Sequence, residues 1–128
     1  MLLKMNLTVL LLILMSVLLS AIAQITLKMG MSSPFIQQAI ASASNVTVFQ
    51  SIATNLYVLG GLTLYFASAA VWLFVLAKVD VSFAYPFVGL GFIATMLLAY
   101  FINGEVLSTT KIVGTLCIAI GVAIVAQG

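Results

Sequence analysis

The sequence predicts an all-α integral membrane protein with four transmembrane helices in a single domain, residues 1–128. Of the 128 residues, 65% are hydrophobic and 5% are charged, and the mean hydropathy is +1.38. Soluble domains carry about 25% charged residues, so four lysines and two acidic residues cannot cover a water-exposed surface. Because a helix needs about 20 apolar residues to cross the hydrocarbon, the chain has room for four spans and little else.

Four apolar segments have the length of a membrane span. They cover about residues 7–29, 56–77, 81–102 and 110–126. Polar residues at 78–80 and 103–105 predict tight connections, so the last three helices should run antiparallel in series. The first run also contains a small-x-small pattern at 21–23, which a signal peptidase could cut. That run is longer than the core of a signal peptide (about 7–15 residues) and continues past the site, which favours a retained helix.

The segment 31–51, between the first two spans, has a different character. It carries no charge and is rich in Ser, Ala and Gln. Ser33 followed by Pro34 is a helix start signal, because serine caps a helix and proline suits its first position. Apolar residues then recur at helical spacing: Phe35, Ile36, Ala39, Ile40 and Ala43. The segment is therefore expected to be a loop with a short helix in the membrane interface, with an ordered loop as the alternative.

The lysines give a nearly balanced orientation signal. Lys4 and Lys78 fall on one side of the predicted topology, and Lys28 and Lys111 fall on the other. The two sides of the membrane therefore carry equal numbers of lysines, and the positive-inside rule hardly favours either orientation. The same balance would be found in a protein that inserts in both orientations. The uncharged first loop is easy to translocate, which favours the N-terminus inside.

The first span carries a polar band of four residues spaced four apart: Ser16, Ser20, Gln24 and Lys28. Successive members are offset by ~40° around a helix, so they form one slowly winding stripe. The serines have an alternative role in packing helices together. An amide or ammonium group left against lipid is costly, so Gln24 and Lys28 favour a bundle interior or a wet cavity. Lys28 could instead extend to the headgroups.

The second and third spans add further candidate substrate contacts. Tyr65 and Ser68 lie one helical turn apart on the second span. On the third, Pro86 cannot donate a backbone hydrogen bond and predicts a kink. Tyr85 beside it provides a hydroxyl group and an aromatic face at a point where freed backbone groups line a cavity or find partners. We expect Tyr65, Ser68 and Tyr85 to contact substrate.

The fourth span has a face of small residues, Gly114, Ala119 and Gly121. Helices in lipid associate through close van der Waals packing, which small residues permit. This face is therefore the predicted dimer seam.

The composition excludes several kinds of chemistry. There is no histidine or arginine, and Cys117 is the only cysteine, which removes disulfides, zinc sites and imidazole bases. No nucleotide-binding loop is present, and the net charge of +2 is too small to indicate a nucleic-acid partner. We therefore expect no enzyme activity, cofactor or metal. Apart from Lys28 near a helix end, no helix interior contains an ionisable residue of the kind that proton coupling needs, and Asp80 and Glu105 lie in the connections.

Three stretches resemble small multidrug resistance proteins of the drug/metabolite transporter superfamily. They are LLSAIAQITLKMG (18–30), YFASAAVWLFVLAKVDVSFAY (65–85) and NGEVLSTTKIVGTLCIAIGVAIVA (103–126). The resemblance implies a four-helix subunit that works as a dimer. Drug exporters of this family carry a glutamate where this chain has Ser20, and a tryptophan expected shortly after Tyr85 is missing. The chain is more similar to the branch that flips aminoarabinose-phosphoundecaprenol for lipid A modification, which forms homodimers or, more usually, heterodimers.

This resemblance implies a flippase that moves a polyprenyl-phosphate-linked sugar between the leaflets of the bacterial inner membrane. In that function Ser20 and Gln24 would replace the sugar's bonds to water, Tyr85 would stack on the ring, and Lys28 would pair with the phosphate. Two alternatives remain. One is a proton-coupled exporter of small cations or metabolites that uses Glu105, and the other is a non-transporting subunit that scaffolds a glycosyltransferase.

Overall fold

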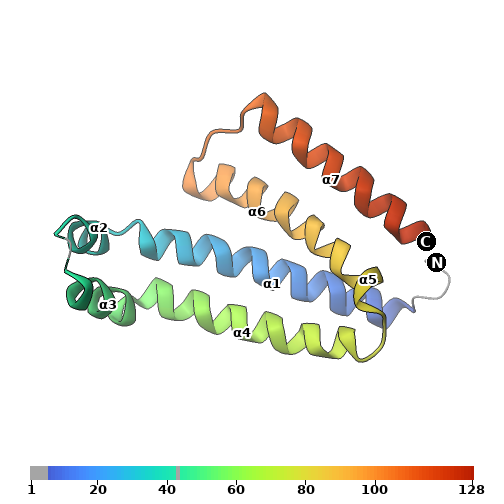
Figure 1. Cartoon of the computed structure of the whole chain (residues 1–128), viewed down its shortest axis with the longest axis horizontal. Coiled ribbons are helices and arrows are strands. Elements are labelled where there is room, and N and C mark those ends of the chain that lie inside the picture. The colour runs from blue at the N-terminus through green and yellow to red at the C-terminus, as the bar shows by residue number, and fades with distance from the viewer. Residues whose placement is uncertain (1–5, 43) are drawn as a thin grey trace.

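The computed structural model describes residues 6–42 and 44–128, and all regular secondary structure in these ranges is helical (Figure 1). Lys4 and Ala43 lie outside the described residues. The elements are α1 (Leu7–Met31), α2 (Pro34–Ala41), α3 (Asn45–Thr54), α4 (Leu56–Leu76), α5 (Val81–Ala84), the 3-10 turn η1 (Tyr85–Phe87), α6 (Val88–Asn103) and α7 (Thr109–Gln127). Four segments are long and apolar enough to cross a membrane: α1, α4, the α5–η1–α6 unit and α7. The predicted all-helical class with four membrane-length helices is confirmed, and it is that of a multi-pass membrane protein.

α1 and α4 form an antiparallel pair (Figure 1), and they come close together at two glycines. A Cβ atom added to Gly30 would lie 2.7 Å from Val58 Cγ2 and 2.9 Å from the Val58 backbone nitrogen. One added to Gly61 would lie 2.7 Å from Leu27 Cγ. In lipid, the hydrophobic effect does not drive helices together, so they associate through close van der Waals packing, which small residues permit. Gly60, next in the chain to Gly61, faces open space.

The third span is interrupted at Pro86. A four-residue helix, α5, leads into the 3-10 turn that contains the proline, and α6 begins directly after it. Proline has no backbone N–H to donate and its ring crowds the preceding turn, so the backbone tightens locally instead of continuing as a straight α-helix. The interruption sets the direction in which α6 leaves the end of α4.

The connection from α6 to α7 is fixed by caps at both ends. Gly104 has φ +69°, in the left-handed region that glycine adopts without strain. The backbone N–H groups of Gly104 and Glu105 donate to the Ala99 carbonyl, which closes the end of α6. Ser108 then caps α7 by accepting a hydrogen bond from the Lys111 backbone N–H at 3.2 Å. The side chains that lie between these caps are therefore held at a defined place.

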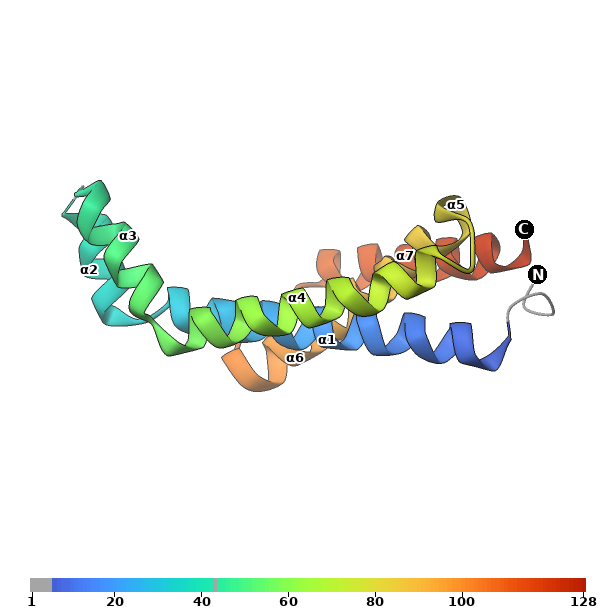
Figure 2. The same cartoon turned by 90° about the horizontal axis from the view of Figure 1, so that it is seen from below.

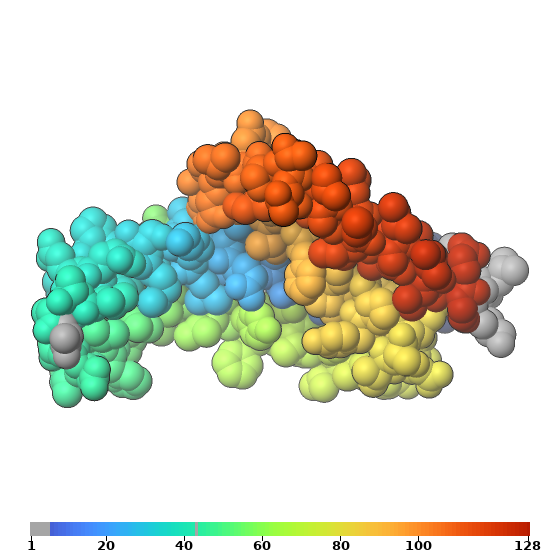
Figure 3. Space-filling view, turned by 45° about the horizontal axis from the view of Figure 1, so that its top comes forward, coloured from blue at the N-terminus to red at the C-terminus, as the bar shows by residue number. Residues whose placement is uncertain are grey.

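α7 lies against α6 on the outside of the molecule (Figure 3). The two helices come close together at Gly89, where an added Cβ would lie 2.7 Å from Ile118 Cγ2. Two of the residues predicted to form a dimer seam, Gly114 and Gly121, are exposed and face open space, and Ala119 is half-buried. Gly114 and Gly121 are thus not used for packing within the described chain, whereas Ala119 is partly covered.

The segment between α1 and α4 forms two short helices rather than one. Ser33 caps α2 by accepting from the Ile36 backbone N–H at 3.4 Å, and Pro34 occupies the first turn. Ser44 caps α3 in the same way through the Thr47 backbone N–H at 3.4 Å. α2 and α3 pack against each other as a helical hairpin. Figures 1 and 2 together show that this hairpin runs across the long axis of α1 and α4.

The buried core lies toward the end of the molecule where the termini are found. It consists of Val9, Ile13, Val17, Val75, Ala84, Phe87, Val122 and Ala126. All four spans contribute to it, so they converge at this end. Toward the opposite end α6 and α7 diverge from α1 and α4 (Figure 1). This divergence leaves room for a cavity between the helices.

Candidate functional site

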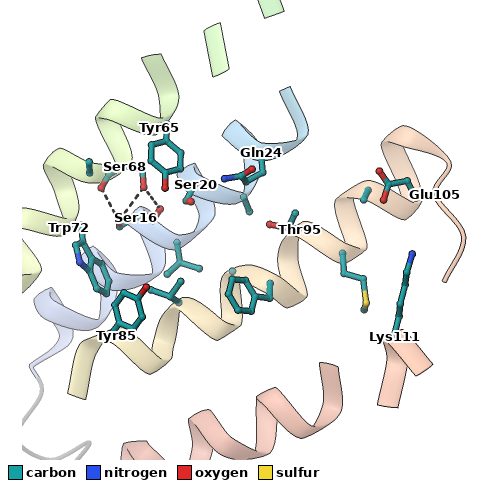
Figure 4. A pocket seen from close by; sticks show the side chains of 18 residues that line it. Ser16, Ser20, Gln24, Tyr65, Ser68, Trp72, Tyr85, Thr95, Glu105 and Lys111 are labelled. Carbon is teal, nitrogen blue, oxygen red and sulfur yellow. Dashed lines mark hydrogen bonds between the residues drawn. The ribbon is translucent and has the colours of Figure 1, made fainter. Parts of the chain in front are cut away.

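A cavity of about 760 Å³ lies between α1, α4 and α6 and reaches the α6–α7 connection. Its polar and aromatic lining (Figure 4) consists of Phe92 and the labelled residues Ser16, Ser20, Gln24, Tyr65, Ser68, Trp72, Tyr85, Thr95, Glu105 and Lys111. Small and apolar residues such as Gly91 and Ala69 complete the wall. This volume lies within the range of small-molecule sites, about 300–1,000 Å³.

Ser16 and Ser68 join α1 to α4 at one side of the cavity. The Ser16 hydroxyl donates to the Ser68 carbonyl at 2.9 Å, and the Ser68 hydroxyl donates to the Ser16 carbonyl at 3.0 Å. Both residues are buried. Interhelical bonds of this kind contribute about 0.6–2 kcal/mol each in membranes. The geometry therefore gives these two serines a packing role, and their donors are already in use.

The other hydroxyl and amide groups of the cavity are free of such bonds. Among the side chains drawn in Figure 4, hydrogen bonds join only the two serines just described. Ser20 and Thr95 are half-buried on facing helices, and Gln24 is exposed. Their polar groups can therefore exchange a bond to water for a bond to a ligand. Thr95 was not among the residues predicted to contact substrate.

The aromatic side of the cavity opens at the surface of the spans. Tyr85 is 63% exposed, Phe92 59% and Tyr65 47%, although all three line the cavity. Trp72 is half-buried and lies opposite Tyr85 (Figure 4). Phe92 and Tyr65 lie within membrane-length helices, so this side of the cavity opens on the flank of the spans rather than only at their ends. A ligand with an apolar tail could enter from the side.

The charged residues of the cavity gather at one end. Glu105 is half-buried and Lys111 is exposed, and their side chains face each other without forming an ion pair (Figure 4). Nζ of Lys111 donates to the Val106 carbonyl at 3.1 Å. An ammonium group has three donors, so two remain for a ligand. The cavity thus has a neutral polar body and an end that contains one carboxylate and one ammonium group.

The structure brings together six of the seven residues predicted to contact substrate: Ser16, Ser20, Gln24, Tyr65, Ser68 and Tyr85 all line the cavity. Lys28 does not line it. The four-residue spacing drifts by ~40° per step, so the polar band has turned by ~120° between Ser16 and Lys28. Lys28 is exposed near the end of α1.

Lys111, which was not among the residues predicted to contact substrate, lines the cavity. Its place depends on how the α6–α7 connection returns toward α1, which no local pattern reveals. The only sequence signals were its proximity to Glu105 and to the Ser108 cap. Within the described ranges, no three His, Cys, Asp or Glu side chains lie close enough together to hold a metal ion.

No protein-family model, curated protein or solved structure matches this chain. A functional proposal therefore depends on the cavity, its opening and the sequence resemblance.

Proposed function

We propose that this protein is a flippase that moves a polyprenyl-phosphate-linked sugar between the leaflets of the bacterial inner membrane. The observation that supports this most strongly is the lateral opening of a polar cavity beside Tyr65, Tyr85 and Phe92. A substrate that keeps its hydrocarbon tail in the bilayer needs such an opening, because only its headgroup has to cross. A free solute needs access from water instead.

The body of the cavity suits a sugar. Moving a hydroxyl group from water to hydrocarbon with no replacement bond costs about 4–8 kcal/mol. Ser20, Gln24 and Thr95 offer donors and acceptors along the path, and none of them is occupied by another cavity side chain. Tyr85 and Trp72 provide flat apolar surfaces against which a sugar ring can lie. The cavity thereby lowers the cost of carrying the headgroup through the bilayer.

The charged end suits the phosphate. Lys111 lines the cavity and has two N–H donors beyond the one that binds the Val106 carbonyl. It lies in the first turn of α7, where the helix dipole also favours an anion. Hydrogen bonds to ionised partners are stronger than neutral ones. In this proposal Lys111 replaces Lys28 as the phosphate contact.

The energy source in this proposal is consumption of the substrate on the far side. The middle of the cavity contains no carboxylate that could exchange a proton for cargo; Glu105 lies at its end. Facilitated movement needs only that the polar path lower the barrier in both directions. The second subunit, an identical or related chain, would pack on the exposed small-residue face of α7, which includes Gly114 and Gly121.

Replacing Gln24 with leucine should slow headgroup transfer by about three- to tenfold, because one hydrogen bond of about 0.5–1.5 kcal/mol is lost along the path. The measurement is flipping of a fluorescent short-chain polyprenyl phosphate sugar in proteoliposomes. Gln38→Leu on α2, outside the cavity, is the matched control and should flip at the wild-type rate. Equal rates in the two variants would remove Gln24 from the path.

A proton-coupled exporter is the second candidate, since Glu105 lines the cavity. It predicts that a pH gradient drives uptake of a small cation into vesicles and that Glu105→Gln abolishes this uptake. The flippase predicts the reverse: Glu105→Gln flips the lipid-linked sugar at least as fast as wild type, because it removes a negative charge near the phosphate. Uptake that follows the pH gradient and disappears in Glu105→Gln would establish the exporter instead.

A further inference from the structure

The outer face of α3 carries an apolar stripe that no other described helix covers. Val46 is 69% exposed and Phe49 is 74% exposed, and Ala53 is also exposed. Spacings of three and four place these residues on one face of a helix. The opposite face of α3 includes Ser51, which is buried, so α3 is already packed on its inner side. The stripe, Val46–Phe49–Ala53, is left without a protein partner.

The hairpin that carries this stripe is fixed firmly to the ends of the spans. The Asn55 side chain accepts from the Val58 backbone N–H at 3.1 Å and donates to the Gly30 carbonyl at 3.5 Å and to the Ser33 hydroxyl at 3.4 Å. One side chain thus links the end of α1, the start of α2 and the start of α4. The direction in which the stripe points is therefore set by the spans.

The position and direction of the hairpin place it at a membrane surface. α1 has 25 residues, or ~37 Å at 1.5 Å per residue, which exceeds a hydrocarbon thickness of about 30 Å. Its end therefore emerges among the headgroups, where the hairpin begins. Figure 2 shows that α2 and α3 then run across the axis of the spans instead of continuing along it into water.

The hairpin also lacks charge. No Lys, Arg, Asp or Glu occurs in residues 29–77. The polar residues of α3 are uncharged: Asn45, Thr47, Gln50, Ser51 and Thr54. A surface that faces bulk water normally carries charged side chains, and membrane-surface helices that rely on anionic lipid carry Lys or Arg. Neutral polar groups beside an exposed phenylalanine fit the boundary between headgroups and acyl chains.

We propose that the stripe Val46–Phe49–Ala53 is a lipid-binding face that seats in the headgroup–acyl boundary and does so without electrostatic attraction. The hairpin lies toward the same side of the molecule as the α6–α7 connection (Figure 1), and Glu105 in this connection and Lys111 just after it line the cavity. Seating the hairpin in the boundary therefore fixes the depth of that cavity end relative to the headgroups. This inference concerns the bilayer itself and is independent of the proposed substrate.

Tryptophan depth measurement tests the proposal in the full-length protein. Trp72 is the only tryptophan, so Trp72→Phe gives a silent background into which Phe49→Trp is introduced. Thr47→Trp is the matched control, because Thr47 is exposed but lies on another side of α3. In phosphatidylcholine vesicles brominated near the top of the acyl chains, the tryptophan at 49 should be quenched several-fold more strongly than the one at 47.

A second tryptophan variant and a second lipid composition complete the test. Val46→Trp, on the same stripe, should behave like Phe49→Trp and guards against misfolding of one variant. Quenching should be the same in neutral and phosphatidylglycerol vesicles. If the tryptophans at 46 and 49 are quenched by aqueous iodide and not by brominated lipid, the stripe faces water or a protein partner and the proposal is wrong. Quenching by lipid only in anionic vesicles would also overturn it.

Discussion

Lys111→Gln is expected to reduce flipping of a polyprenyl-phosphate-linked sugar by about ten- to a hundredfold. The reason is the loss of charge-assisted hydrogen bonds to phosphate, which contribute about 1.5–3 kcal/mol. Lys111 lines the cavity, and within the described ranges its ammonium group donates only to the Val106 carbonyl. The rate would be measured in proteoliposomes with a fluorescent short-chain analogue, at equal protein incorporation.

Lys28→Gln is the matched control for this experiment. Lys28 is also an exposed lysine, in the last turn of α1, but it does not line the cavity. Its replacement should leave the rate within about twofold, since a difference of 0.4 kcal/mol or less is about twofold. If Lys28→Gln abolishes flipping while Lys111→Gln does not, the phosphate contact is the one first inferred from the polar band of α1.

Gly30→Ala is expected to have the largest effect on stability. Its Cβ would lie 2.8 Å from Asn55 Oδ1 and 2.9 Å from the Val58 backbone nitrogen, neither of which can move without disturbing the cap of α4. Overpacking of this kind costs about 1–3 kcal/mol. The measurement is the SDS concentration at which helical circular dichroism and Trp72 fluorescence are lost.

Gly60→Ala provides the comparison, because its Cβ would meet no atom within 4 Å. Alanine is a better helix former than glycine by about 0.8–1 kcal/mol, so Gly60→Ala should be as stable as wild type or more stable. A Gly30→Ala variant as stable as Gly60→Ala would contradict the close contact between α1 and α4.

The positions of the four membrane-length helices were predictable because they follow from hydropathy. A membrane helix must satisfy its own backbone and expose apolar side chains to lipid, so the apolar runs define the helices to within a few residues. The expected 7–29 and 110–126 became Leu7–Met31 and Thr109–Gln127. The helix that starts at Ser33-Pro34 was also predictable, since a cap and a proline act locally.

α3 was not predicted. Its sequence, Asn45–Thr54, mixes apolar and uncharged polar residues, and only Ser44 marks its start. Packing against α2 stabilises α3, because the helix propensity of a segment this short is not sufficient on its own.

The cavity was predictable only in part, since its lining comes from segments that are distant in sequence. The polar band of α1 pointed to Ser20 and Gln24, because unpaired polar groups in a span need a reason to be there. Thr95, Glu105 and Lys111 join them only through the kink at Pro86 and the return of the chain after Gly104. The kink and the turn decide in which directions α6 and α7 run, and the spacing of residues in the sequence does not reveal these directions.

The most direct test of the proposed flippase function is to measure flipping by the purified chain alone. The protein would be reconstituted into vesicles that contain a fluorescent short-chain polyprenyl phosphate sugar, and the fraction accessible to a membrane-impermeant oxidant of the sugar would be followed over time. If the chain is a flippase, the fraction of the fluorescent lipid that the oxidant can reach should rise from about half to nearly all. The rate of this rise should increase with the amount of protein. A rate no greater than in protein-free vesicles, together with co-purification of a glycosyltransferase, would contradict the flippase function and indicate a scaffolding subunit.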